Sequence, residues 1–252
     1  MHPAASTGGQ VAELAGFDTA SGDCFGWSSA ISGNIIVVGA PNHGGDAGRA
    51  YVFTRSPHGQ WNPDGELVGP DTGVGDNFGL SVAISGTTIV VGAPLHASKA
   101  RRACVFTRIA QGWKQTAELV GSDTVAGDDF GWSVAPSGTI IVVGAHGHAS
   151  GAGRAYVFTK GATGWRRTAV LSNSQGLGMS VAISGTDIVA SNGLAAYTFT
   201  TSTTGWRQTA KLWTSNDAGH NLFGWSLAVS GTTVVVGAIF ASSARLVYVF
   251  QA

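Results

Sequence analysis

The stretch FGWSVAPSGTIIVVGA, residues 130–145, is followed by GRAYVFTK and GWRRTAVL, and versions of these phrases recur along most of the chain. The first phrase restarts at Phe25, Phe78, Leu177 and Phe223, so the chain consists of five units of about 50 residues. A repeat of this length is typical of propellers and solenoids, in which each unit is one supersecondary element.

Each unit contains four short apolar runs, which in the third unit are residues 132–136, 139–143, 155–159 and 166–171. The runs are rich in Val, Ile, Tyr, Phe and Thr and are separated by Ser-Gly, Gly-rich or Gly-Trp segments, a pattern that indicates strands joined by turns. Four antiparallel strands repeated radially form a β-propeller. The sequence therefore predicts an all-β, five-bladed propeller that occupies residues 1–252 as one domain.

The last unit ends at VYVFQA and lacks the fourth run, whereas QVAELAGFDTASGDCFGW at residues 10–27 resembles QTAELVGSDTVAGDDFGW at residues 115–132. We therefore expect residues 11–14 to pair beside residues 247–250 as the fourth strand of the last blade. Such closure would remove an exposed sheet edge and tie the ends of the chain together.

The composition excludes several classes of partner. The chain has 14 Lys and Arg and 14 Asp and Glu, so no net field favours nucleic acid or an anionic membrane. No apolar run approaches the roughly 20 residues of a spanning helix, and we expect no membrane insertion. Cys24 and Cys104 stand at different positions of the repeat, so we expect two free thiols and no disulfide. We also expect the chain to be a monomer.

Phe-Gly opens four of the first strands, and Gly-Ala-Pro closes two of the second strands, at residues 39–41 and 92–94. In this order and spacing the motifs resemble the FG-GAP repeat family, known from the propeller of integrin α subunits and from bacterial extracellular proteins. The resemblance covers nearly the whole chain from Val11 onward. It implies a propeller fold and an extracellular or secreted location.

One departure from the family concerns metal binding. Integrin-type repeats often carry a calcium loop between the first and second strands, and calcium takes about six to eight oxygen ligands. Here that connection is a tight Ser-Gly hairpin, as in ISGNI and PSGTI, which is too short to surround the ion. We therefore expect no metal site and no cofactor.

The loops that differ between units belong to one face of the propeller. This variable face carries the connections from the second to the third strand and from the fourth strand to the next blade. In the fourth unit both are shortened, around residues 172–176 and 192–196. Two interpretations are open. The shortened loops form an indentation that holds a ligand, since pockets are concave and few, or they result from a deletion without function, which surface loops tolerate.

Histidines and aspartates recur on the same face. His43, His96 and His148 stand at equivalent positions with His146 beside the last, and Asp23, Asp76 and Asp128 each precede the start of a blade. Metal ligands must converge on one ion, and loops on separate blades are too far apart unless they fold toward the axis. If they do not bind a metal, the histidines either cap loops, or are solvated, or contact a ligand. The aspartates are expected to accept hydrogen bonds from nearby backbone groups and so to fix turns.

A further set of equivalent residues follows each Phe-Gly or its counterpart: Trp27, Leu80, Trp132, Met179 and Trp225. In integrin α subunits aromatic residues at the axial mouth receive a basic side chain, so the resemblance implies an aromatic platform for a cation or a sugar face. Packing alone favours the alternative that these side chains fill the space between blades. The same argument predicts that most of the eight tryptophans are buried.

No catalytic signature is present, and the leading hypothesis is a non-catalytic module that binds a glycan, peptide or protein partner on the variable face. The expected ligand contacts are His43, His96, His146, His148, Trp27, Trp132, Trp225 and Phe240. The alternative is an enzyme whose histidine base is oriented by an aspartate at the axial mouth or the indentation. Its candidate residues are His148, His146, His43, His96 and Asp128.

Overall fold

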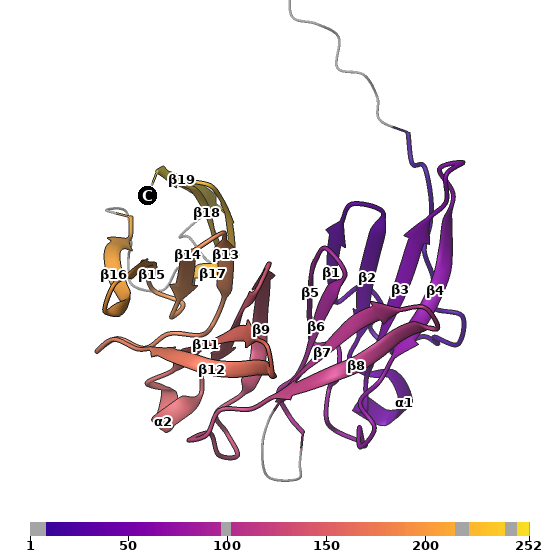
Figure 1. The fold of residues 1–252 in the computed structure, drawn as a ribbon, viewed down its shortest axis with the longest axis horizontal. Helices are drawn as coiled ribbons and strands as arrows, with labels where there is room; N and C mark the ends of the chain where they lie inside the picture. The colour runs from indigo at the N-terminus through magenta and orange to yellow at the C-terminus, as the bar shows by residue number, and fades with distance from the viewer. Residues whose placement is uncertain (1–8, 97–101, 215–221, 240–245, 252) are drawn as a thin grey trace, which may run out of the picture.

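The computed structural model describes residues 9–96, 102–214, 222–239 and 246–251. Its strands form five antiparallel sheets, each made of strands that are consecutive in the sequence. Figure 1 shows these sheets as the blades of a propeller, in chain order. The predicted all-β, five-bladed β-propeller is therefore confirmed.

The blades have the following strands. Blade one contains β1 (Ser28–Ser32), β2 (Ile35–Ala40), β3 (Arg49–Arg55) and β4 (Trp61–Leu67). Blade two contains β5 (Ser81–Ser85), β6 (Thr88–Ala93), β7 (Arg102–Ile109) and β8 (Gly112–Leu119). Blade three contains β9 (Phe130–Ser137), β10 (Ile140–Ala145), β11 (Arg154–Gly161) and β12 (Gly164–Leu171). Blade four contains β13 (Val181–Ser184), β14 (Asp187–Ser191), β15 (Ala196–Ser202) and β16 (Gly205–Leu212), and blade five contains β17 (Phe223–Ser230), β18 (Thr233–Ala238) and β19 (Leu246–Gln251). Two single turns, α1 (His43–Asp46) and α2 (His148–Gly151), lie in the connections from second to third strand of blades one and three.

The core lies between neighbouring blades. Between blades one and two, Val37 and Val52 pack with Phe78 and Ile89. Phe78 and its counterparts Phe130 and Phe223 are fully buried, so the Phe of the Phe-Gly motif anchors blades two, three and five on the preceding blade. Burial of one such side chain contributes roughly 1.5–3 kcal/mol.

The glycines of the repeat allow the blades to approach at backbone distance. A Cβ atom at Gly92 would lie 2.0 Å from the carbonyl oxygen of Gly131, in the Phe-Gly of the next blade. The Oγ atom of Ser81 donates a hydrogen bond to the same carbonyl at 2.8 Å. Equivalent bonds join Ser28 to Gly79 and Ser133 to Gly178.

A second set of serines joins the blades at the opposite face. The backbone N–H of Gly86 donates to Ser32 Oγ at 3.0 Å, from the hairpin of blade two to that of blade one. The pairs Gly138 with Ser85, Gly185 with Ser137 and Gly231 with Ser184 repeat this bond at 3.1–3.2 Å. The Ser-Gly hairpins thus connect each blade to the next.

The expected closure of the last blade is wrong. Among the described residues the sheet of blade five has three strands, and residues 11–14 belong to no strand, with Val11 91% exposed. Leu14 instead packs against the blade-one cluster that contains Tyr51. The reason is that the next residues fasten this segment to blade one: Phe17 contacts the Tyr51 ring edge-on at 5.6 Å, and the Tyr51 hydroxyl donates to Asp18 at 2.7 Å.

The tryptophans are less buried than the repeat pattern suggested. Five are partly buried, and Trp27, Trp213 and Trp225 are exposed by 63%, 60% and 43%. The partly buried ones include Trp113, which packs between blades one and two. The expectation of a mostly buried set is therefore wrong, because part of each indole lies at the rim or the axis.

Both cysteines are free thiols, as expected. Cys104 is fully buried in β7, and this burial raises the pKa of its thiol to about 12. Since the thiolate is the reactive form, Cys104 is unreactive at neutral pH.

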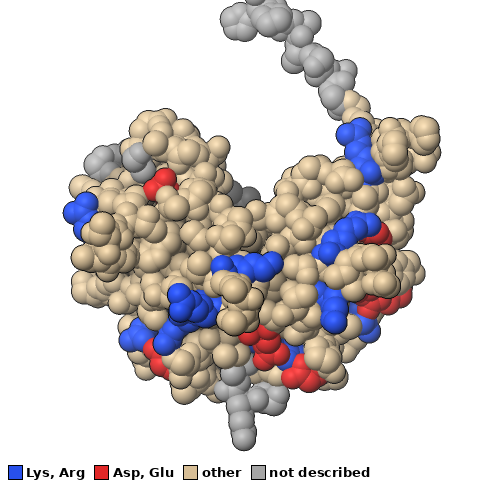
Figure 2. All heavy atoms as spheres, viewed as in Figure 1, with Lys and Arg blue, Asp and Glu red and all other residues tan. Residues whose placement is uncertain are grey.

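Basic and acidic side chains intermingle on the face seen in Figure 2, where blue and red atoms lie side by side over its lower part. This distribution matches the formal net charge of zero. In the part of the chain that the structure describes, no helix has the length and apolar character needed to cross a membrane.

We expect Gly92→Ala to destabilise the propeller by about 3 kcal/mol, because its Cβ would push against a backbone oxygen that cannot move without separating two blades. Gly73→Ala is the matched control, since nothing lies within 4 Å of a Cβ there, and it should change stability by about 0.5 kcal/mol or less. Urea unfolding measures both, and equal midpoints for the two variants would contradict the assigned role of the Phe-Gly contact.

Candidate functional site

The loops that enter blades one, two and three are each held by an aspartate. Asp23, Asp76 and Asp128 accept a hydrogen bond from the backbone N–H three residues earlier, each at 2.8 Å. This bond closes a turn just before the first strand, as expected from the recurrence of the aspartates.

The same carboxylates bind the histidines of the variable face. The Nδ1 atoms of His43, His96 and His148 lie 2.8, 2.6 and 2.7 Å from the Oδ2 atoms of Asp23, Asp76 and Asp128. Each aspartate–histidine pair therefore connects the loop before the first strand to the loop after the second strand of one blade. The pairs are repeated parts of the loop architecture, and the three histidines stay on their own blades.

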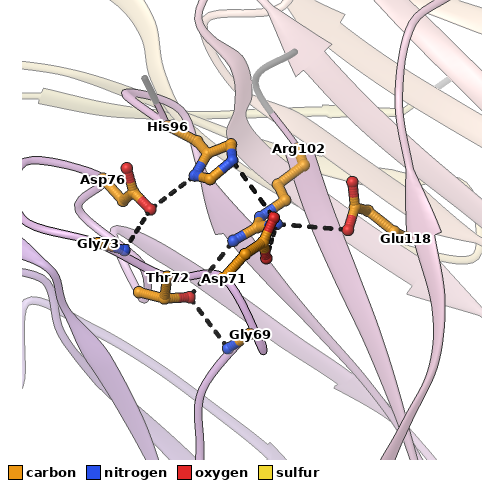
Figure 3. A network of polar contacts seen from close by, with 8 residues as sticks. All are labelled: Gly69, Asp71, Thr72, Gly73, Asp76, His96, Arg102 and Glu118. Carbon is orange, nitrogen blue, oxygen red and sulfur yellow. Dashed lines mark hydrogen bonds and ion pairs between the residues drawn. The ribbon is translucent and has the colours of Figure 1, made fainter. Parts of the chain in front are cut away.

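A second group of charges surrounds the pair of blade two, as Figure 3 shows. The side chain of Arg102 is fully buried and forms ion pairs with Asp71 and, at 3.4 Å, with Glu118. The Nε2 atom of His96 lies 3.7 Å from Asp71. The hydrogen bond and charge of Arg102 hold the pKa of Asp71 below its usual value.

In blades one and three a tyrosine donates to the equivalent aspartate, Tyr51 to Asp18 and Tyr156 to Asp123. Asp123 accepts a hydrogen bond from Tyr156 at 3.1 Å and pairs with Arg154. Burial opposes ionisation of Asp123, but the bond from Tyr156 and the charge of Arg154 outweigh it, so the pKa of Asp123 is lowered.

Blade four replaces these charges with amides. Gln175 accepts from the Tyr197 hydroxyl at 2.9 Å through its side chain, and its backbone oxygen accepts from Asn192 Nδ2 at 2.7 Å. The two shortened connections thus lie side by side at the same face, which confirms the predicted placement. That they form a ligand site stays a prediction.

The residues that follow Phe-Gly meet around the propeller axis. Trp27, Leu80, Trp132, Met179 and Trp225, one from each blade, line a cavity of about 470 Å³ together with Ser28, Ser81, Ser133 and Ser180. Trp27 and Trp225 are exposed, so the interpretation that they fill the space between blades is wrong for these two. The indole of Trp132 stacks on His146, with ring centroids 4.5 Å apart and planes inclined by 37°.

The structure therefore divides the expected ligand contacts. It brings Trp27, Trp132 and Trp225 to one cavity. His146 contacts the ring of Trp132, and its Nδ1 atom lies 3.7 Å from Asp129 Oδ2. The three histidines of the aspartate–histidine pairs do not line this cavity. Phe240 lies outside the described residues.

The alternative of a His–Asp active site meets one of its two conditions. His43, His96 and His148 each lie within hydrogen-bond distance of an aspartate, but the pair of blade three does not line one hollow together. Asp128 lines a hollow of about 300 Å³ together with Gly147 and Ala149, whereas His148 is not among its lining residues. Among the described residues, no three His, Cys, Asp or Glu side chains are grouped so as to hold a metal ion.

Comparison with known families identifies the repeat. The profile of the FG-GAP repeat matches residues 9–53, 61–106, 113–158 and 206–250. The chain belongs to the FG-GAP repeat family. The longest interval that the profile does not match, residues 159–205, contains the first three strands of blade four. In this blade both variable-face loops are shortened and Gly-Ala-Pro is lost.

Solved structures with a similar fold are far in sequence from this FG-GAP protein. A chain in the crystal structure of a mitotic checkpoint complex shares 12% identity at a TM-score of 0.59, over 89% of this chain and 60% of that one. A putative 6-phosphogluconolactonase from Bacteroides uniformis shares 12% identity at a TM-score of 0.63, over 90% of this chain and 67% of that one. Such distant likeness supports the fold alone. No curated protein matches.

Sequence reasoning missed the pairing of each aspartate with a histidine, although a signal was present. The two residues are 20 positions apart in all three blades. A constant separation of this kind indicates that two loops of one unit meet. The role of Arg102 had a similar signal, because Arg49, Arg102 and Arg154 each begin the third strand of a blade, and each pairs with an acidic side chain.

The lowered pKa values predict loss of stability in acid. Asp23, Asp71 and Asp123 have folded pKa values below 3.8, so their contribution is complete above that pH and is lost as the pH falls through the folded pKa. We expect the urea midpoint to fall as the pH is lowered from about 5 to about 2.5. Asp71→Asn should flatten this decline and cost only about 0.5–1 kcal/mol at pH 6, because the Asp71 side chain is 57% exposed and solvent screens its charge. Glu13→Gln, which removes an exposed carboxylate elsewhere, should leave the curve unchanged; a curve for Asp71→Asn parallel to wild type would contradict the argument.

Proposed function

We propose that this FG-GAP protein is an extracellular binding module that recognises a glycan in the axial cavity of its variable face. The observation that carries the proposal is the convergence of three indoles, two of them exposed, on one hollow of about 470 Å³. A volume of this size is in the range of small-molecule sites. An extracellular setting is typical of the family to which the chain belongs.

The chemistry of the cavity suits a sugar. Indoles offer flat apolar surfaces with a polar N–H at the edge, which fits the mixed character of a sugar ring. The hydroxyl groups of Ser28, Ser81 and Ser133 donate to backbone carbonyls, and their oxygens retain lone pairs that accept bonds from sugar hydroxyls. The cavity therefore combines aromatic faces with hydrogen-bond acceptors.

The aspartate–histidine pairs support the binding module over the enzyme. They hold together two loops of one blade, and each uses the Nδ1 atom of its histidine on a turn-forming carboxylate. In blades one and two the other ring nitrogen lies 3.7 Å from a second aspartate. A histidine with carboxylates on both sides is placed to brace two loops.

A glycan array followed by titration calorimetry tests the proposal. We expect binding at one site per chain, with Trp27→Ala and Trp225→Ala each weakening the best glycan at least about tenfold, because each removes an aromatic face worth about 1.4 kcal/mol. Trp213→Ala is the matched control, since Trp213 is equally exposed but does not line the cavity. Glycan binding that survives both cavity variants, or no binding to any glycan, would refute the proposal.

A further inference from the structure

Asp64 of blade one shows how the rim of the propeller binds a carboxylate. Its Oδ2 atom accepts hydrogen bonds from the hydroxyl of Thr54 at 2.7 Å and from the indole N–H of Trp113 at 3.0 Å. Arg108 donates to both carboxylate oxygens, at 2.5 and 3.1 Å. Thr54 belongs to blade one, whereas Arg108 and Trp113 belong to blade two. The groove between these two blades therefore holds one acid among three donors.

The groove between blades two and three has the same kinds of donor at the same positions. Its residues Thr107, Lys160 and Trp165 are the counterparts, one blade later, of Thr54, Arg108 and Trp113. Arg108 is opposite Trp113 in its sheet. Lys160 is likewise opposite Trp165. The Cζ atom of Arg108 and the Nζ atom of Lys160 lie 5.7 and 5.9 Å from the centroids of these indoles. The cation and the indole are thus arranged alike in both grooves.

Among the described residues, the second groove has no counterpart of the acid. Thr116 on β8 takes the position of Asp64 on β4, because each precedes the last Leu of its strand by three residues. The arginines of blade three that form described ion pairs both bind Asp123, and Lys160 forms none with a described residue. The indole N–H of Trp165 has no hydrogen-bond partner in the same set. Two donors therefore surround the place where the first groove has a carboxylate.

The groove between blades three and four lacks the cation. Thr201 of β15 is opposite Trp206, so it stands where blade three has Lys160. Three grooves are bounded by two described fourth strands, those between blades one and two, two and three, and three and four. Of these three, the groove between blades two and three is the one that combines a cation with no carboxylate.

Further cations continue along the rim on both sides of this groove. Lys114, Arg166 and Arg207 each follow the tryptophan of a fourth strand, and all three are exposed. None of them forms an ion pair with a described residue, and blade one has Asn62 at this position. Cα atoms of β12 lie within 8 Å of both β8 and β16. Residues 130–252 contain seven Lys and Arg but two Asp and Glu, so the rim of blades two to four attracts anions although the whole chain is neutral.

We propose that the groove between blades two and three binds a carboxylate of an acidic polysaccharide. The carboxylate takes the place that Asp64 fills one blade earlier, and it accepts hydrogen bonds from the Lys160 ammonium and the Trp165 indole. A polysaccharide of uronic acids carries a carboxylate on every sugar, so neighbouring sugars reach Lys114 and Arg166. Single cations on separate blades of a convex rim suit such a flexible chain better than a flat membrane. This site is separate from the axial cavity, and its failure would leave the proposed glycan site untouched.

A long oligogalacturonate is the probe, and its methyl ester is the matched uncharged ligand. Titration calorimetry with the full chain should show saturable binding of the acid that weakens as salt is added, because salt screens exposed charges. The methyl ester should not bind, since it has no carboxylate for Lys160. No binding of the oligogalacturonate, equal binding of its methyl ester, or tighter binding of polyglutamate at equal charge would overturn the proposal.

Two chain variants locate the site. Thr116→Asp supplies the acid from within the chain, as Asp64 does in the first groove, and Lys160→Gln removes the cation. Each should weaken the oligogalacturonate at least about fivefold, because a charged hydrogen bond in a partly exposed groove is lost. Thr116 is exposed, so the new carboxylate should not prevent folding.

The controls separate a defined groove from general attraction. Thr116→Asn has the size of the acid without its charge and should leave the affinity unchanged. Arg55→Gln should also leave it unchanged, because Arg55 is opposite Trp61 as Lys160 is opposite Trp165, but it lies on blade one. Trp27→Ala, in the axial cavity, should have no effect either. Equal losses in Thr116→Asp and Thr116→Asn, or in Lys160→Gln and Arg55→Gln, would overturn the proposal.

Discussion

The propeller depends on one contact, in which the carbonyl oxygen of a Phe-Gly glycine is held between the Gly-Ala glycine and a serine hydroxyl of the preceding blade. Gly131 shows it in full: its oxygen accepts from Ser81 Oγ at 2.8 Å, and a Cβ at Gly92 would lie only 2.0 Å away. Both glycines are required because the two backbones meet without side chains between them. Blade four keeps the contact with a variation, since Ser191 stands in the place of the Gly-Ala glycine and donates to the Gly224 oxygen at 2.5 Å.

This contact also explains where the candidate ligand site lies. In blades two to five the Phe-Gly backbone or its counterpart is fixed against the preceding blade, so the next residue is carried to the same height around the axis. Its side chain has no position in the inter-blade core, which is already filled by the Phe of the motif. Trp132 and Trp225 are therefore brought to the cavity that Trp27 of blade one also lines.

Much of this could be read from the sequence, because repetition converts a weak local signal into a strong one. Five Ser-Gly hairpins and five apolar runs before them predicted the strands, and paired deletions in blade four predicted two short loops on one face. The closing strand was mistaken because QVAEL matches a strand in letters, while the contacts of Phe17 and Asp18 with Tyr51 decide where that segment lies. The exposure of Trp27 and Trp225 could not be predicted from the sequence either. Alternation along a strand shows which face a side chain lies on, but it does not show how wide the axial space is that this face lines.

The division of labour among the strands of a blade explains how blade five packs on blade four. The serine and glycine contacts that join the blades come from the first two strands and their hairpin, as in the bond from Gly231 to Ser184. Phe223 and Val234 of blade five are fully buried against blade four without any fourth strand. The fourth strand contributes mainly an indole at the rim and hydrogen bonds to the third strand. The contacts that hold blade five on blade four therefore come mainly from its first two strands and their hairpin.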